Sequence, residues 1–111
     1  MCNYYLAVDI GASSGRHIIG WVQDHVMKVR EIYRFFNGME MVDGTLCWNL
    51  VGLFEEIKAG MRECKKLGIN PESMGIDTWA VDYVLLDKQG RRLGESVGYR
   101  DGRTKGMDTR V

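Results

Sequence analysis

The sequence has few of the residues that cross-link or break small folds, and it has no net charge. Its 111 residues include one proline and three cysteines, and 15 Lys and Arg balance 15 Asp and Glu. Three cysteines without metal-type spacing argue against a disulfide framework or a zinc site. The balanced charge argues against binding to nucleic acid or to an anionic membrane mainly through bulk electrostatics. A local basic patch is still compatible with it.

Long apolar runs and targeting signals are also missing. No apolar stretch approaches the roughly 18 residues of a membrane helix. The amino terminus lacks the basic segment of a secretory signal and reaches an acid at Asp9. We therefore expect a cytoplasmic protein with reduced thiols and no membrane partner. Glycine, by contrast, is abundant at 14 residues, which indicates many turns or close backbone approaches.

The first part of the chain has the pattern of consecutive strands. Residues 4–10 are nearly all apolar, as in a strand covered on both faces. Residues 17–22 and 26–36 are the next two predicted strands. The Asp43-Gly44 pair has the composition of a two-residue hairpin turn. Together these segments predict a meander followed by a small hairpin.

A change of period then predicts a helix over residues 50–67, where apolar side chains recur at helical spacing. Asn49 is the expected N-cap and Gly68 the expected stop. After this crossover, residues 73–78 are expected to form a strand parallel to residues 4–10. Further strands are expected at residues 81–87 and 96–100.

A loop of small residues follows the first predicted strand. Its sequence is Asp9-Ile10-Gly11-Ala12-Ser13-Ser14-Gly15-Arg16. Consecutive turn amides can form an anion-binding nest, and an arginine can pair with phosphate oxygens. Asp9, at the carboxyl end of the strand, is placed to hold hydrated Mg²⁺. An ordinary hairpin turn with a surface arginine explains the same residues.

A second polar segment closes the predicted strand at residues 73–78. It reads Gly75-Ile76-Asp77-Thr78-Trp79-Ala80-Val81-Asp82. Carboxylates accept protons from sugar hydroxyls, and an indole covers the apolar face of a sugar ring. A structural turn with a half-buried tryptophan is the simpler interpretation of this segment alone.

Taken together, these segments resemble the amino-terminal part of the rhamnulokinases, which belong to the FGGY carbohydrate kinases of the actin-like ATPase superfamily. The resemblance is carried, in collinear order over nearly the whole chain, by residues 7–16, 31–35, 75–79, 81–87 and 99–104. Glycine-rich loops occur across the superfamily. The Ile-Asp-Thr-Trp and Tyr-Arg-Asp segments are far more specific.

The resemblance implies a ribonuclease H-like first lobe and transfer of a phosphoryl group from ATP, with Mg²⁺, to the 1-hydroxyl of L-rhamnulose. By position, the residues that would bind the ATP phosphates are Ala12, Ser13, Ser14, Gly15 and Arg16. The sugar-contact position falls on Ala80, with Trp79 and Asp82 beside it, and Asp9 would hold the metal through water. Ala80 departs from the family, which has glycine there, so the identity of the ketose stays open.

Members of this family are several times longer than this chain, and their aspartate general base and adenosine pocket lie in later sequence. The general base is therefore expected beyond Val111, the last residue of this sequence. We expect residues 1–111 to be a truncated portion of the first lobe that contains no catalytic residue and is inactive alone. An incomplete lobe exposes apolar surface, so self-association is expected.

Two other classes fit parts of the sequence. A ribonuclease H-like two-metal nuclease would use Asp9, Glu56 and Asp77 as a carboxylate cluster. The zero net charge and the lack of a basic stripe count against it. A non-catalytic actin-like interaction module cannot be separated from a portion of a kinase on these residues.

Overall fold

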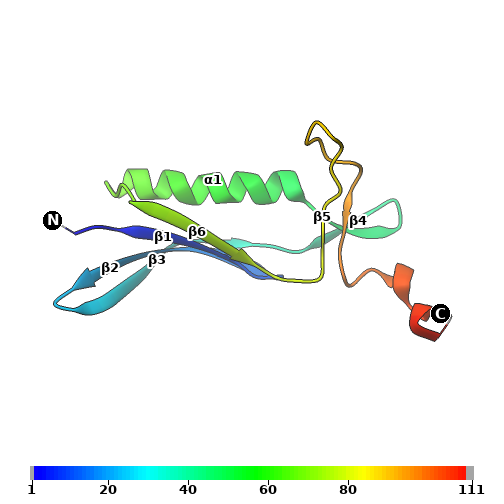
Figure 1. The fold of residues 1–111 in the computed structure, drawn as a ribbon, viewed down its shortest axis with the longest axis horizontal. Helices are drawn as coiled ribbons and strands as arrows, with labels where there is room; N and C mark the ends of the chain where they lie inside the picture. The colour runs from blue at the N-terminus through cyan, green and yellow to red at the C-terminus, as the bar shows by residue number, and fades with distance from the viewer. Residues whose placement is uncertain (1, 110–111) are drawn as a thin grey trace. The chain divides into compact units, whose positions relative to one another are not determined.

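In a computed structural model, which describes residues 2–109, the chain forms two compact units (Figure 1). The first unit contains the residues up to 37 and residues 51–79, and the second contains residues 38–50 and the residues from 80 onwards. The mixed α/β architecture with a crossover helix, predicted from the hydrophobic pattern, is confirmed. Val111 lies outside the described residues, so the expectation that the aspartate general base follows it stays a prediction.

The first unit is built on a four-stranded sheet in the order β3-β2-β1-β6. The first three strands run antiparallel, and β6 pairs with β1 in parallel, as a helical crossover between them requires. β2 begins at Ser14 rather than at the predicted His17, because pairing of Ile10 with Gly15 extends the ladder to the loop. The strands are β1 (Tyr5–Ile10), β2 (Ser14–Gln23), β3 (Val26–Phe36) and β6 (Ser73–Thr78).

The crossover helix, α1 (Leu50–Lys66), confirms the predicted helix and its stop. Gly68 has a φ of 74°, a conformation that favours glycine. Its amide donates to the carbonyl of Lys65 at 3.0 Å, and the Ile69 amide donates to the carbonyl of Cys64 at 2.9 Å. These two bonds form a Schellman motif, which satisfies the last carbonyls of the helix and directs the chain into β6.

α1 covers the sheet face that carries the apolar side chains of β1. Along β1 the buried side chains alternate with more exposed ones, so Asp9 belongs to the opposite face. At two places a glycine is required because an aromatic ring occupies the space of a side chain. A Cβ at Gly15 would overlap the ring of Phe35, and a Cβ at Gly60 of α1 would overlap the ring of His17. The buried core consists of Leu6, Val8, Ile10, Ile19, Phe35 and Cys64.

His17 is completely buried beneath α1. Its Nε2 donates to the carbonyl oxygen of Ile57 at 3.0 Å, and its Nδ1 has no partner within the described residues. Burial lowers the pKa of His17 below its ordinary value of 6.5, against the opposing effect of the Ile57 hydrogen bond. The unfolded chain therefore binds a proton more readily than the folded chain. The stability that the neutral ring confers is complete above pH 6.5 and is lost as the pH falls through and below that value.

We expect the free energy of unfolding to fall more steeply with decreasing pH in the parent chain than in a His17→Gln variant. The measurement is urea denaturation at several pH values between about 7.5 and about 5.5, the range in which a histidine changes charge. His25, the other histidine, is exposed in the turn between β2 and β3 and provides the control. The His25→Gln variant should keep the pH dependence of the parent, and equal slopes in all three proteins would contradict the prediction.

The second unit contains a three-stranded sheet in the order β4-β5-β7. The predicted hairpin turn is confirmed, with φ values of 48° at Asp43 and 80° at Gly44. Trp48, at the end of β5, is among the most deeply buried side chains of the chain. The predicted strand at residues 96–100 is shorter than expected. The elements of this unit are β4 (Met39–Val42), β5 (Thr45–Trp48), β7 (Ser96–Val97), η1 (Gly102–Thr104) and η2 (Met107–Thr109).

The strand predicted at residues 81–87 is wrong. This segment forms only an isolated bridge between Leu86 and Arg92. Val81 has a φ of 71°, which is unusual for a β-branched residue and interrupts an extended chain. At the other end, the Asp87 carboxylate accepts hydrogen bonds from the amides of Gln89 and Arg91 and forms a local turn. The apolar alternation of the segment is real, but no neighbouring strand pairs along it.

Within residues 2–109, no helix combines the length and the apolar character that crossing a bilayer requires.

Candidate functional site

The loop between β1 and β2 is held in shape by its own backbone and by Asn37. The Gly11 amide donates to the carbonyl of Ser14 at 2.9 Å. From the end of β3, the Asn37 side-chain amide donates to the carbonyl of Gly11 at 2.8 Å, and the Asn37 backbone amide donates to that of Ser13 at 3.0 Å. Asn37 is buried, and sequence reasoning missed its role, because an Asn-Gly pair after a strand is also the composition of a simple turn.

Two amides of this loop are available for an external acceptor. Among the described residues, the N–H groups of Ala12 and Ser13 donate to no protein oxygen, whereas the amide of Gly11 is used inside the loop. Adjacent free amides in a turn are the arrangement that binds an oxyanion. Ser14 begins β2 and adds a hydroxyl beside them.

Gly15 has a packing role that the sequence did not indicate. It is buried and lies under the ring of Phe35, on the side of the sheet that faces α1.

On the opposite face of the sheet, three charged residues lie side by side. Asp9 on β1 is paired in register with Arg16 on β2 and with Asp77 on β6. The Arg16 Nε lies 3.5 Å from the Asp9 Oδ2, and these side chains are 39% and 46% exposed. The Arg16 Nε itself is buried and makes no hydrogen bond within the described residues. An arginine at the start of the strand that follows two free amides has the chemistry to pair with a phosphate group.

Asp9 and Asp77 are neighbours in the register of β1 and β6. The nearby Asp9 carboxyl group raises the pKa of Asp77, and desolvation acts in the same direction. Glu56, the third acid of the predicted nuclease cluster, does not join them. It lies on α1, which covers the other face of the sheet, and it accepts a hydrogen bond from the Tyr33 hydroxyl at 2.5 Å. The described residues contain no group of three potential metal ligands, so this carboxylate cluster is not formed.

The residues predicted to contact sugar are divided between the two units. Trp79 is partly buried and packs against the core of the first unit. Ala80 and Asp82 belong to the second unit, in which Ala80 is exposed. Asp82 accepts a hydrogen bond from the Trp48 indole at 2.6 Å, which the sequence did not indicate. The sugar contacts of these three residues stay predictions.

The sequence is similar to rhamnulokinases from several bacteria. It is 52% identical over 105 residues to the rhamnulokinase of Halalkalibacterium halodurans, a match that covers 95% of this chain and 22% of the relative. It is 49% identical to the enzyme of Klebsiella pneumoniae strain 342 over 92% of this chain and 21% of that protein. For Bacillus subtilis the identity is 47%, over 90% of this chain and 21% of the relative. The chain therefore spans about a fifth of the length of these relatives.

The fold is similar to that of solved sugar kinases. Gluconate kinase from Lactobacillus acidophilus matches with a TM-score of 0.74 at 10% identity, over 99% of this chain and 22% of that one. Xylulose kinase from Rhodospirillum rubrum matches with a TM-score of 0.71 at 20% identity, over 100% of this chain and 24% of that one. These matches confirm the fold that the resemblance implies. No family model matches the chain.

Proposed function

Since this chain is homologous to the amino-terminal part of the rhamnulokinases, we propose that it supplies the phosphate-binding part of a cytoplasmic, ATP-dependent L-rhamnulose kinase. The observation that carries the proposal is the pair of free amides at Ala12 and Ser13, followed in β2 by Arg16, whose Nε has no hydrogen-bond partner. In this proposal the phosphates of ATP contact Ala12, Ser13, Ser14, Gly15 and Arg16.

Phosphoryl transfer depends mainly on positioning and on stabilising negative charge. The amides of Ala12 and Ser13 point fixed dipoles at a phosphate oxygen, and Arg16 adds a full positive charge. Bound Mg²⁺ would neutralise charge on the triphosphate. Asp9 would accept hydrogen bonds from water on that ion, which suits an ion that keeps most of its water. Each of these groups stands on a strand end or on the restrained loop.

The sugar would meet Trp79, Ala80 and Asp82 in this proposal. The indole offers an apolar surface, and the carboxylate accepts hydroxyl protons. Ala80 carries one methyl group more than the family's glycine, which reduces the space for a substituent on the sugar. L-rhamnulose is the proposed substrate because the relatives are named for it.

A chimera tests the proposed function. Residues 1–111 replace the matching segment of the Bacillus subtilis relative, to which this chain is 47% identical over 100 residues. We expect turnover that requires ATP, Mg²⁺ and L-rhamnulose, measured by coupled release of ADP. The 111-residue chain alone should show none, because the proposed general base lies beyond Val111 and most of the relative's length is missing from it. A folded chimera that binds no ATP, or rhamnulose-dependent turnover by the chain alone, would overturn these assignments.

Arg16→Ala in the chimera should raise the KM for ATP by about 10- to 100-fold, because a charge-assisted hydrogen bond contributes about 1.5–3 kcal/mol. Arg34→Ala is the matched control. Arg34 lies opposite Arg16 in the register of β3 but is paired with Glu31 at 2.8 Å. Its replacement should leave the KM for ATP unchanged. Equal effects of the two substitutions, or none from Arg16→Ala, would remove the role assigned to Arg16.

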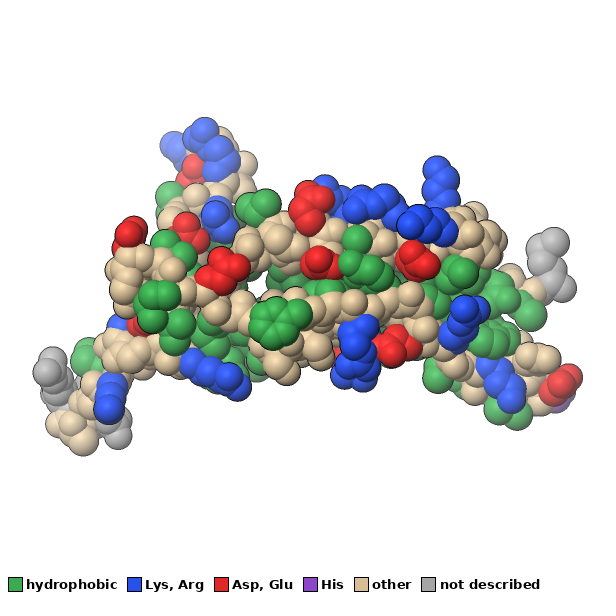
Figure 2. Space-filling model, turned by 180° about the vertical axis from the view of Figure 1, so that it is seen from behind, with side chains coloured by type: hydrophobic (Ala, Val, Ile, Leu, Met, Phe, Trp, Pro, Cys, Tyr) green, Lys and Arg blue, Asp and Glu red, His purple; other side chains and the backbone are tan. Residues whose placement is uncertain are grey.

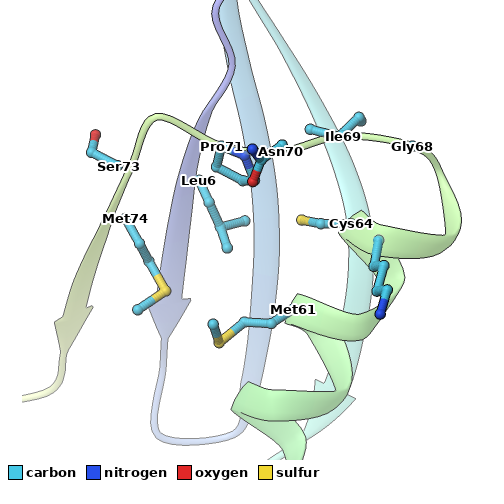
Figure 3. A pocket seen from close by; sticks show the side chains of 10 residues that line it. Leu6, Met61, Cys64, Gly68, Ile69, Asn70, Pro71, Ser73 and Met74 are labelled. Atoms are coloured by element: carbon cyan, nitrogen blue, oxygen red, sulfur yellow. The ribbon is translucent and has the colours of Figure 1, made fainter.

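The isolated chain is also proposed to self-associate. An apolar groove of about 640 Å³ lies between α1 and the start of β6. Leu6, Met61, Cys64 and Met74 point into it (Figure 3). β6 is an edge strand, and its Met74 and Ile76 side chains are 44% and 51% exposed. Apolar side chains are also visible at the surface among the charged ones (Figure 2). An unprotected apolar edge favours pairing with another chain.

We expect the chain to sediment as a concentration-dependent dimer or larger species, and Ile76→Lys to shift it towards monomer. Val29→Lys places the same charge on β3, the other edge of the sheet, where Val29 is also exposed. It should leave the association unchanged. A monomer at high concentration would contradict self-association. If Val29→Lys and not Ile76→Lys reduced the association, the contact would lie at β3, and the assignment to β6 would be wrong.

A further inference from the structure

Two buried residues of the second unit hold the irregular stretch at residues 80–83. The indole Nε1 of Trp48 donates to the Asp82 Oδ2 at 2.6 Å. The Ser96 hydroxyl donates to the carbonyl of Tyr83 at 3.0 Å. Trp48 and Ser96 are 2% and 4% exposed, whereas Tyr83 is 62% exposed. Two consecutive residues of a surface stretch are therefore each hydrogen-bonded to a buried side chain.

The register of the three-stranded sheet brings the two donors together. Trp48 ends β5, Ser96 begins β7, and the two residues are opposite each other in the antiparallel ladder. Side chains at opposite positions of neighbouring strands lie on the same face of a sheet. Trp48 and Ser96 consequently form a two-point clamp on residues 82 and 83.

The clamp acts directly after a strained residue. Val81 lies between Ala80 and Asp82 and has a φ of 71°, a region that costs a β-branched residue free energy. The residue is 77% exposed, so packing of its side chain does not impose this conformation. Strained backbone persists where the surrounding structure fixes it, and it clusters at ligand sites. The hydrogen bonds to Asp82 and Tyr83 are placed to fix the chain that follows Val81.

We propose that Trp48 and Ser96 are positioning residues for the sugar, because their clamp fixes the direction of the Asp82 carboxylate and the backbone that leads to it from Ala80. This inference rests on the proposed function, in which Ala80 and Asp82 contact the sugar. A carboxylate offers about four acceptor sites, so the bond from the indole is compatible with a bond from a sugar hydroxyl. Trp48 is buried and acts through Asp82.

The clamp should affect the sugar and not the nucleotide. Ala12, Ser13 and Arg16, which are proposed to bind phosphate, belong to the first unit, whereas both members of the clamp and both of their acceptors belong to the second. A small misplacement of a group that positions a substrate weakens its interaction strongly. A residue needed only for folding would instead change the behaviour towards both substrates.

Substitutions in the chimera test this separation. Trp48→Phe keeps an aromatic ring and removes the indole N–H, and we expect the KM for L-rhamnulose to rise by about tenfold, as for a lost hydrogen bond to a charged group. Ser96→Ala removes a bond between neutral groups and should raise it by about threefold. The KM for ATP should stay constant in both variants. Trp21→Phe is the matched control, because the Trp21 indole donates to the exposed side chain of Gln23 at 3.3 Å in the first unit. It should leave both constants unchanged.

A second measurement does not depend on activity or on the folding of Trp48→Phe. The three tryptophans of the 111-residue chain give three indole N–H resonances when the chain is labelled with ¹⁵N. Asp82→Ala removes the acceptor and should shift the indole proton resonance of Trp48, while that of Trp21 stays in place.

A Trp48 resonance that does not respond to Asp82→Ala would overturn the proposal. A folded Trp48→Phe chimera with the KM of the parent for L-rhamnulose would also overturn it, as would one with equal increases in both KM values. A Ser96→Ala chimera identical to the parent would remove Ser96 from the positioning role. A parent chimera that does not turn over L-rhamnulose would overturn the proposed function instead, and with it the role of the clamp towards the sugar.

Discussion

Replacing Gly15 with alanine should destabilise the chain by about 1–3 kcal/mol, the usual cost of forcing extra volume into a packed core. The reason is that a methyl group at this position would overlap the Phe35 ring, which is only 6% exposed. The measurement is the free energy of unfolding in urea. The expected loss is large for one added methyl group, because overlap with a buried ring cannot be relieved by a small shift.

Gly75→Ala provides the matched control for this prediction. Gly75 also lies in a strand of the same sheet, β6, but a Cβ there would meet no atom within 4 Å. Its replacement should change stability by less than about 0.5 kcal/mol, as substitutions away from packed features do. In a Phe35→Leu background, where the ring is gone, Gly15→Ala should cost much less than in the parent. A Gly15→Ala chain as stable as the parent would show that packing against the Phe35 ring does not require glycine at this position.

Gly60→Ala should destabilise the chain by about 1–2 kcal/mol, although alanine is the better helix former by up to about 1 kcal/mol. The added methyl group would overlap the ring of His17, which is completely buried and hydrogen-bonded to the carbonyl of Ile57. Moving the ring breaks that bond and leaves a second buried ring nitrogen without a partner. Packing therefore outweighs the helix propensity.

A double-mutant cycle tests this explanation. His17→Ala opens space beneath α1, so Gly60→Ala in that background should be neutral or stabilising. The interaction energy between the two substitutions should then be well above the roughly 0.5 kcal/mol within which independent sites add. Additive effects of the two substitutions would contradict the steric explanation.

The regular elements of the first unit follow from local sequence. The helical spacing of Leu53, Ile57 and Cys64 is what places α1 on the apolar face of the sheet. Gly68 ends the helix because glycine readily adopts the positive φ of a helix C-terminus, a property of the residue itself. The parallel pairing of β6 with β1 follows from the crossover between them. In each case the deciding information lies within a few residues of the feature.

Features that depend on a distant partner were not predictable in the same way. The segment at residues 81–87 has the alternation of a strand, yet whether a strand forms depends on a neighbour that pairs with it. Asn37 looks like a turn residue until β3 brings it against the loop at residues 11–13. The ring of Phe35 above Gly15 is likewise a contact between strands.

The candidate site was predictable in its residue types but not in its pairings. The glycines, serines and arginine of the loop were singled out from their composition, and the family resemblance then assigned the residues from Ala12 to Arg16 to phosphate. Grouping Glu56 with Asp9 was wrong, and the sequence contains the reason. Buried and exposed side chains alternate along β1, and Asp9 lies on the face opposite the apolar residues. The helix that carries Glu56 packs on the apolar face. The neighbour of Asp9 is Asp77, which only the parallel register identifies.

The hydrogen bonds from Asn37 give the loop after β1 a thermodynamic character of its own. Two bonds from Asn37 and one bond within the loop fix the backbone from Gly11 to Ser14 before any anion is present. The entropy of that segment is therefore lost when the chain folds and not when an anion binds. A preorganised receptor of this kind keeps more of its interaction energy as affinity, and the residue responsible lies outside the segment that touches the anion.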